Sequence, residues 1–148
     1  MEILIDDRQS RHRLPNQKIR MTAKRILNAL DYPDGQLSVL IVDDEQIAQL
    51  NMAYLQHTGP TNVISFPMQE GPFADVTPDL LGDVVISADT AHREAADAGM
   101  EMMERFNQLL IHGILHLVGY DHVHSAEEAE IMDQKSNELF NLIGKEED

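Results

Sequence analysis

The chain contains no cysteine among its 148 residues. This absence excludes disulfide bonds, zinc sites with thiolate ligands and cysteine nucleophiles, and it fits the reducing environment of the cytoplasm. No apolar run approaches the roughly 20 residues that a membrane-spanning helix needs. The first seven residues are acidic and strand-like, unlike a signal peptide. We therefore expect a soluble, cytoplasmic protein without a membrane partner.

Positive charge is also scarce, because the formal net charge is −15. Residues 1–25 hold seven Lys and Arg against three Asp and Glu, a net charge of +4, so the remainder carries −19. Surfaces that bind nucleic acids neutralise phosphates with lysine and arginine, so this balance argues against broad nonspecific RNA binding. Arg20 and Arg25, in the basic segment, are candidate contacts for an RNA backbone, and a solvated helix face explains them equally well.

The length and the apolar patterns predict one α+β domain over residues 1–148. Strand-like segments cover residues 3–5, 37–42, 63–66 and 81–87. Helical spacing covers residues 15–30, 44–55, 90–98, 101–118 and 126–143, and a loop rich in Gly, Pro and Asp covers 68–79. We therefore expect a single compact domain in which helices pack against one small β-sheet.

Three histidines near the end of the long apolar helix are the strongest functional signal. His112 and His116 are four residues apart, which places both imidazoles on one helix face about 5–6 Å apart at Cβ. Gly119 can end the helix in a left-handed cap, so that the chain reverses and brings His122 toward the other two. Three imidazoles without a fourth protein ligand describe an open zinc site that keeps one position for water.

The same spacing of histidines and glycine occurs in the metzincin proteases, which carry a glutamate as general base directly after the first histidine. Here that position is Gly113, which can neither accept a proton from a zinc-bound water nor donate one to a leaving amine. The zinc helix and turn are therefore metzincin-like, while the residue needed for peptide hydrolysis is replaced. We interpret Gly113 as evidence against a protease.

Three ordered segments resemble the YbeY family of bacterial metal-dependent endoribonucleases, which act in ribosomal RNA maturation. They are residues 60–67 (PTNVISFP), 81–87 (LGDVVIS) and 112–122 (HGILHLVGYDH). The resemblance implies a mixed sheet flanked by helices and one zinc ion per chain, held by His112, His116 and His122. It also implies single-strand-specific cleavage of ribosomal RNA near the 3′ end of the small-subunit RNA, and a role in ribosome quality control.

Two positions depart from the family pattern. Asn62 follows Thr61 where the family usually has aspartate, and Leu55 follows Tyr54 where the family usually has arginine. That arginine is thought to line the cleft, where a cation near the metal would stabilise the extra charge of a phosphorane-like transition state. The replacement by leucine therefore bears on the nuclease mechanism and leaves the predicted fold and metal site unaffected.

The remaining site assignments are hypotheses about individual side chains. His116 and Asp121 are the catalytic candidates, with Asp121 either transferring a proton, orienting a ligand imidazole, or serving only as a turn residue. Thr61 and Ser65 either offer hydroxyl groups to the substrate or pack within a strand. Three histidines suit zinc, and nickel or copper would bind at least comparably.

Three functions of different classes follow from these residues. The first is a zinc-dependent endoribonuclease whose partners are single-stranded or ribosomal RNA. The second is a noncatalytic ribosome-assembly factor with a structural metal site, which the leucine at position 55 keeps open. The third, a metallopeptidase-like hydrolase, is disfavoured by Gly113. The strong acidity suggests that specificity comes from docking on ribosomal proteins or assembly factors.

Overall fold

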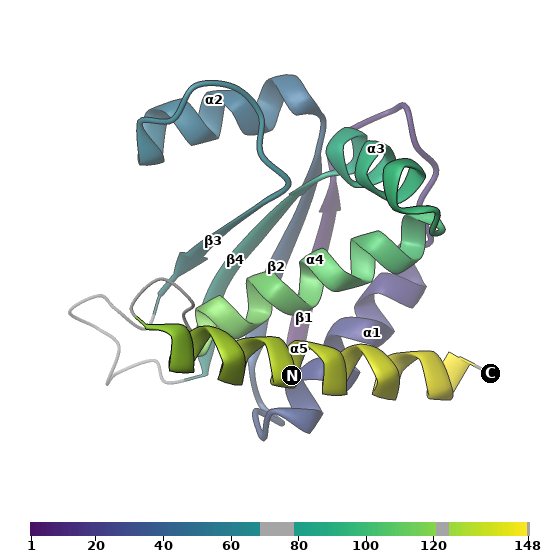
Figure 1. Cartoon of the computed structure of the whole chain (residues 1–148), viewed down its shortest axis with the longest axis vertical. Coiled ribbons are helices and arrows are strands. Elements are labelled where there is room, and N and C mark those ends of the chain that lie inside the picture. The colour runs from purple at the N-terminus through teal and green to yellow at the C-terminus, as the bar shows by residue number, and fades with distance from the viewer. Residues whose placement is uncertain (69–78, 121–124, 148) are drawn as a thin grey trace.

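A computed structural model describes residues 1–68, 79–120 and 125–147, with the side chains of 145–147 left aside (Figure 1). Within these ranges the chain forms four strands and five helices. In chain order they are β1 (Glu2–Asp7), α1 (Asn16–Ala29), β2 (Gln36–Val42), α2 (Asp44–Leu55), β3 (Val63–Pro67), β4 (Leu80–Ser87), α3 (Ala88–Ala98), α4 (Met102–Leu117) and α5 (Ala126–Glu147).

The strands form one sheet in the order β1-β2-β4-β3. The strands β1, β2 and β4 run parallel, and β3 runs antiparallel to β4 at the edge of the sheet. Parallel neighbours require crossover connections, and α1 supplies the one between β1 and β2. The predicted α+β class and the mixed sheet are therefore confirmed. None of the described helices is both long and apolar enough to cross a bilayer.

The sheet is covered on both faces, and the alternation along β2 shows how. Its residues Leu37, Val39 and Ile41 are buried in the main core, together with apolar side chains of α1, α3, α4 and α5. Val42 faces the other way, into a smaller cluster with Ile47 of α2. Figure 1 shows α4 and α5 lying across the main-core face of the sheet. This packing fixes α4, the helix with the paired histidines, directly on the strands.

The observed elements follow the expected ones closely, with differences at the ends. Helix α3 begins at Ala88, two residues before the expected start, because the Ser87 hydroxyl accepts the backbone N–H of Thr90 and caps the helix. Helix α5 continues past the expected end at residue 143 to Glu147, because Lys145, Glu146 and Glu147 have high helix propensity, although Gly144 does not. Most of the expected loop at 68–79 falls in residues 69–78, outside the described residues.

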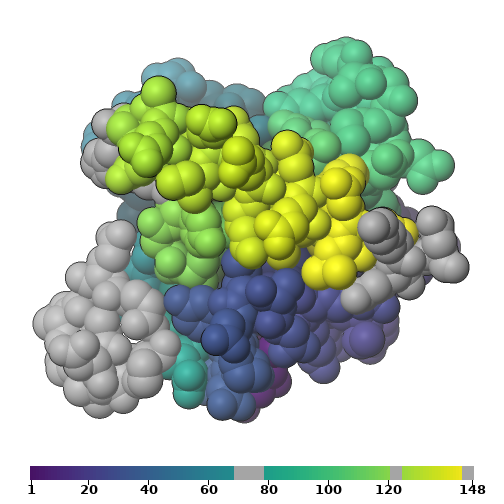
Figure 2. All heavy atoms as spheres, turned by 60° about the horizontal axis from the view of Figure 1, so that its bottom comes forward, coloured from purple at the N-terminus to yellow at the C-terminus, as the bar shows by residue number. Residues whose placement is uncertain are grey.

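Helix α5 closes the main core from outside. The Ser125 hydroxyl accepts the backbone N–H of Glu128 at 3.0 Å and so caps the start of the helix. The buried residues of α5 enter the main core; they are Met132, Leu139 and Ile143. In the space-filling view, α5 crosses the surface in lime and yellow directly beside α1, in blue (Figure 2). Helix α5 therefore packs against both α4 and α1 and covers the main core from outside.

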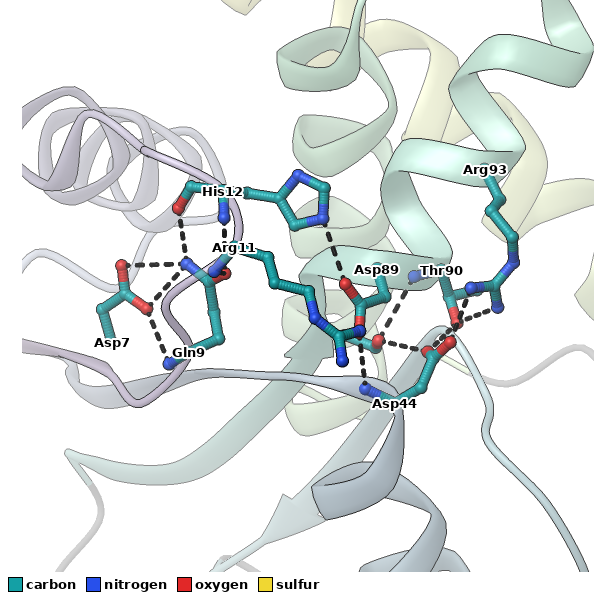
Figure 3. Close-up of polar contacts among 9 residues, drawn as sticks. Asp7, Gln9, Arg11, His12, Asp44, Asp89, Thr90 and Arg93 are labelled. Carbon is teal, nitrogen blue, oxygen red and sulfur yellow. Dashed lines mark hydrogen bonds and ion pairs between the residues drawn. The ribbon is translucent and has the colours of Figure 1, made fainter.

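A polar network occupies the end of the sheet where the parallel strands finish (Figure 3). Asp89 is only 7% exposed and lies at its centre. Its carboxylate contacts the Arg11 guanidinium at 3.1 Å, the His12 ring at 3.0 Å and the backbone N–H of Asp44 at 3.1 Å. These contacts tie the segment after β1 to the starts of α2 and α3, so the network is structural.

The pKa of Asp44 gives this network a pH dependence. Burial raises the pKa, but hydrogen bonds from Arg93, Thr90 and Ser87 together outweigh burial and leave the pKa below the ordinary 3.8. A carboxyl with a lowered folded-state pKa stabilises the protein above its unfolded pKa, and this stabilisation is lost as the pH falls through the folded pKa.

We expect Arg93→Met to lower the free energy of unfolding at pH 7 by about 0.2–1 kcal/mol, because the guanidinium is half exposed. The difference from the parent should shrink as the pH falls below 3.8, since Asp44 is then increasingly protonated. Urea unfolding at several pH values measures this, with Arg8→Met, which breaks the exposed pair with Asp6, as the control. A deficit that stays constant down to the lowest pH would contradict this account.

Candidate metal centre

The two histidines of α4 converge as the sequence predicts. Both are half-buried, and the Nε2 atoms of His112 and His116 lie 3.1 Å apart with the ring centroids at 4.6 Å. Two imidazole nitrogens at about 2.0–2.1 Å from a tetrahedral zinc would be about 3.3 Å apart. The spacing of the ring nitrogens therefore fits a shared zinc ion without moving the helix.

Helix α4 ends in a Schellman motif that confirms the predicted glycine stop. Gly119 has a positive φ of 102°. Its N–H donates to the carbonyl of His116, and the N–H of Tyr120 donates to the carbonyl of Leu115. The motif turns the chain away from the helix directly after the histidine pair. His122 and Asp121 lie outside the described residues, so the third ligand and the proton-transfer role remain predictions.

Replacing Gly119 by alanine should cost about 1–2 kcal/mol in the free energy of unfolding, because a side chain is strained at this positive φ. The variant should also bind zinc more weakly, since the predicted third ligand, His122, follows this turn in the sequence. Gly99→Ala is the matched control, because Gly99 ends α3 at a φ of +68° and, as at Gly119, an added Cβ would lie in open space. Calorimetry of unfolding and of zinc binding should show a comparable stability loss in both variants and weaker zinc binding only in Gly119→Ala.

The histidines open into a cleft of about 320 Å³ at the edge of the sheet. Its described lining comes from the end of α2, from edge strand β3 and from the end of α4: Leu55, Val63, Ile64, Ser65, Pro67, His112, His116, Gly119 and Tyr120. The cleft is open to solvent on one side, and the described lining includes no lysine or arginine. A substrate that enters here meets imidazole nitrogens and apolar side chains.

Within the described residues, no set of three or more His, Cys, Asp or Glu side chains is arranged to hold a metal ion. The paired histidines could therefore supply two nitrogen ligands, and a three-ligand site depends on a group beyond the described ranges. The sequence predicts that this group is His122. The residues that are described fit zinc in ligand type and in spacing.

Ser65 lies in the cleft, but its hydroxyl is used by the fold. Its Oγ donates to the backbone carbonyl of Gly113 at 2.8 Å, which fastens β3 to α4. Thr61 precedes β3 and is not among the described residues that line the cleft. The geometry gives Ser65 a positioning role, and the substrate contacts assigned to both hydroxyls remain predictions.

Gly113 lets the histidine helix approach the sheet. A Cβ at this position would lie 2.6 Å from Val84 Cγ1 and 3.2 Å from Val63 Cγ2. The space that a side chain would need is filled by the strands, so glycine is required here for packing. The absence of the metzincin glutamate therefore has a structural cause as well as a chemical consequence.

The predicted basic contacts lie away from the cleft. Arg20 and Arg25 are on α1, which packs beside β1 at the edge of the sheet opposite β3. The Arg20 guanidinium donates to the backbone carbonyl of Ile3. Neither arginine is among the described residues that line the cleft. The structure therefore does not bring these two residues together with the histidines, and an RNA contact there would be remote from the metal site.

A polar chain beside His112 was not anticipated from the sequence. Asn62 donates its amide to the Glu94 carboxylate at 3.2 Å, and Arg105 contacts the same carboxylate at 3.0 Å. Asn62, Arg105 and His112 line a second hollow of about 300 Å³. Arg105 precedes His112 by seven residues, so helical periodicity indicates their shared face. The pairing with Glu94 has no sequence signal.

The same contacts explain the asparagine at position 62. Its amide nitrogen donates to Glu94, and its amide oxygen accepts the backbone N–H of Val63 at 2.8 Å. An aspartate at position 62 could still accept the N–H of Val63, but its carboxylate would lie against the carboxylate of Glu94. The departure from the family pattern is therefore compatible with this local packing.

Comparisons with known proteins agree with the fold and the motifs. The family model described as "Endoribonuclease YbeY" matches residues 4–144. A protein with that name from Geobacter sulfurreducens is 51% identical, over 97% of this chain and 96% of its own length. One from Aquifex aeolicus is 41% identical, over 90% of this chain and 84% of its own length. The chain therefore belongs to the YbeY endoribonuclease family.

A solved structure supports the fold independently. The solution structure of a Thermotoga maritima protein aligns with a TM-score of 0.69, covering 97% of this chain and 90% of that one. Its sequence is 21% identical, so the likeness concerns the fold alone.

Proposed function

We propose that this chain is a zinc-dependent, single-strand-specific endoribonuclease that matures ribosomal RNA in the cytoplasm. A relative that carries the name endoribonuclease is 51% identical over nearly the whole chain. The observation that carries the proposal is the convergence of the His112 and His116 Nε2 atoms, 3.1 Å apart, in an open cleft. The finer assignments are trimming near the 3′ end of the small-subunit RNA and ribosome quality control.

In this proposal His112, His116 and His122 hold one zinc ion per chain. A zinc ion held by these residues would supply Lewis-acid chemistry, either polarising a phosphate oxygen or activating a water at neutral pH. The chain's own contribution is rigidity, because Gly113 seats α4 on the sheet and the Ser65 hydroxyl fastens it to β3. Fixed ligands cost little reorganisation when charge develops on the reacting phosphate.

The described cleft offers the transition state no lysine or arginine, because Leu55 lies where the family usually has arginine. The nearest cation on α4 is Arg105, in the adjoining hollow, and its charge is paired with Glu94. Asp121 remains the candidate for moving a proton. The proposal therefore assigns most of the charge stabilisation to the metal site itself.

A noncatalytic ribosome-assembly factor is the second candidate, and Leu55 is the observation that favours it. In that case the histidines would hold a structural metal, and the protein would bind ribosomal RNA, ribosomal proteins or assembly factors without cutting. The net charge of −15 favours docking on basic partners such as ribosomal proteins.

The test is a panel of substrates given to the zinc-loaded protein. We expect internal cleavage of single-stranded ribosomal RNA containing the small-subunit 3′ end, and much slower cleavage of the same RNA annealed to its complement. Single-stranded DNA of the same sequence and an unfolded casein are the controls. Binding of the RNA without cleavage would favour the assembly factor, and digestion of casein would favour the metallopeptidase-like hydrolase.

A further inference from the structure

An exposed aromatic ring stands beside the histidine cleft. Tyr54, in the last turn of α2, is 62% exposed, and its neighbour Leu55 is 45% exposed. Of the residues of this helix, only Ile47 and Asn51 are buried. Large apolar side chains exposed together next to a cleft are typical of a surface that contacts a ligand. We name Tyr54, Leu55 and Phe66 of β3 the apolar shelf.

Packing contacts fix the position of the apolar shelf. The Tyr54 ring meets the Phe66 ring edge to face, with centroids 5.3 Å apart at an angle of 75°. Phe66 packs against the smaller core cluster beneath α2. The end of α2 is fixed by buried Asn51, whose side chain donates to the Gly59 carbonyl at 2.9 Å. An exposed ring that is already immobilised loses little entropy when a ligand covers it.

The shelf and the histidines share the edge strand. Leu55 lines the cleft together with His112 and His116. Phe66 lies between Ser65 and Pro67 in β3, so its side chain faces the α2 side of the sheet while these two neighbours line the cleft. Leu55, which lines the cleft and directly follows Tyr54, connects the two sides at the edge strand, so a chain that crosses the histidines can continue around β3 onto Tyr54.

Charge indicates which kind of contact the shelf makes. The protein carries −15, and the described cleft lining includes no lysine or arginine, so the side chains themselves offer phosphate groups little attraction away from the proposed metal. Stacking of a base on an aromatic ring needs no positive charge and tolerates any base, because every base has a π-face. A base paired within a duplex does not present that face, so an aromatic contact selects unpaired strands.

We propose that Tyr54, supported by Phe66 and Leu55, stacks an unpaired nucleobase of the RNA that enters the histidine cleft. This inference rests on the proposed function and makes Tyr54 a substrate-binding residue that gives preference for single strands. It also assigns Leu55 a role, as an apolar contact for the stacked base.

The first test uses the absence of tryptophan from the chain, which makes a Tyr54→Trp substitution the only indole in the protein. We expect a single-stranded oligoribonucleotide to quench this fluorescence within the mixing time of a stopped-flow instrument, before products accumulate. The same oligoribonucleotide annealed to its complement should quench much less. Leu4→Trp is the control, because Leu4 is 60% exposed on β1 at the opposite edge of the sheet.

The second test measures affinity by the anisotropy of a labelled single-stranded RNA. Tyr54→Ala should weaken binding about 5- to 150-fold, which corresponds to about 1–3 kcal/mol for one stacked base. Tyr54→Phe should bind like the parent, since the ring is kept. The melting temperature should be nearly unchanged in both variants, because most of the ring is exposed.

Each alternative outcome has its own signature. Equal quenching at positions 54 and 4, or unchanged affinity in Tyr54→Ala while the parent still cleaves RNA, would overturn the stacking and leave the proposed function standing. A parent that neither binds nor cleaves RNA would overturn both. If the fluorescence of the Tyr54→Trp variant changes with protein concentration in the absence of RNA, the ring contacts a second copy of the chain and not a nucleobase.

Discussion

Replacing His116 by alanine should remove zinc binding and lower RNA cleavage by more than about 100-fold. Substitutions of residues that only support a metal ligand cost about 10–100-fold in metal affinity or activity, so the loss of a ligand should cost more. The Nε2 atom of His116 is one of the two nitrogens that converge in the cleft. Cleavage of single-stranded RNA and the zinc content by mass spectrometry are the measurements.

His92→Ala is the matched control, because His92 is an exposed histidine on α3, a different helix, and is not among the described cleft residues. It should keep both zinc and activity. Circular dichroism of the His116 variant should show an intact fold, since His116 is only half-buried. Cleavage by the folded His116 variant at the parent's rate would contradict the metal-centred account.

Replacing Gly113 by alanine should destabilise the protein by about 1–3 kcal/mol, although alanine favours helices in general. The new methyl group would lie 2.6 Å from Val84 Cγ1, so the helix or the strand must move. Because His112 directly precedes this position, the shift should also weaken zinc binding. Urea unfolding and zinc titration measure the two effects.

Gly144→Ala is the control for helix propensity, because Gly144 lies in α5 with open space where its Cβ would be. That variant should gain stability, by up to about 1 kcal/mol. Opposite signs for the two glycines would establish that packing, and not propensity, requires glycine at position 113. Stabilisation by both substitutions would refute the packing argument. Val84→Ala shortens the opposing side chain and makes room for the new methyl group. The double variant Gly113→Ala/Val84→Ala should therefore lose less stability than the sum of the losses in the two single variants.

The sequence was most informative where a local pattern determines the geometry. The spacing of His112 and His116 fixes their common helix face, and Gly119 ends the helix because glycine tolerates a positive φ. Both features depend on neighbours along the chain and need no knowledge of the fold. The short apolar segments likewise predict which parts of the chain enter the sheet.

Long-range contacts could not be predicted in this way. Ser65 lies 48 residues from Gly113, and its side chain bonds to that backbone carbonyl instead of pointing freely to a substrate. Asn62 and Glu94 are 32 residues apart and meet only because β3 starts beside α3. The charge of Arg20 suggests an RNA contact, but its helix packs at the far edge of the sheet from the histidines. Charge and residue type alone do not reveal which surface a side chain shares.

The most direct test of the central claim is a zinc titration of the metal-depleted protein in the presence of single-stranded ribosomal RNA. The account predicts that cleavage is negligible without metal, rises in proportion to added zinc and reaches a plateau at one equivalent per chain. Cleavage at full rate in the metal-depleted protein, or none at any zinc concentration while the metal is bound, would contradict a zinc-dependent endoribonuclease.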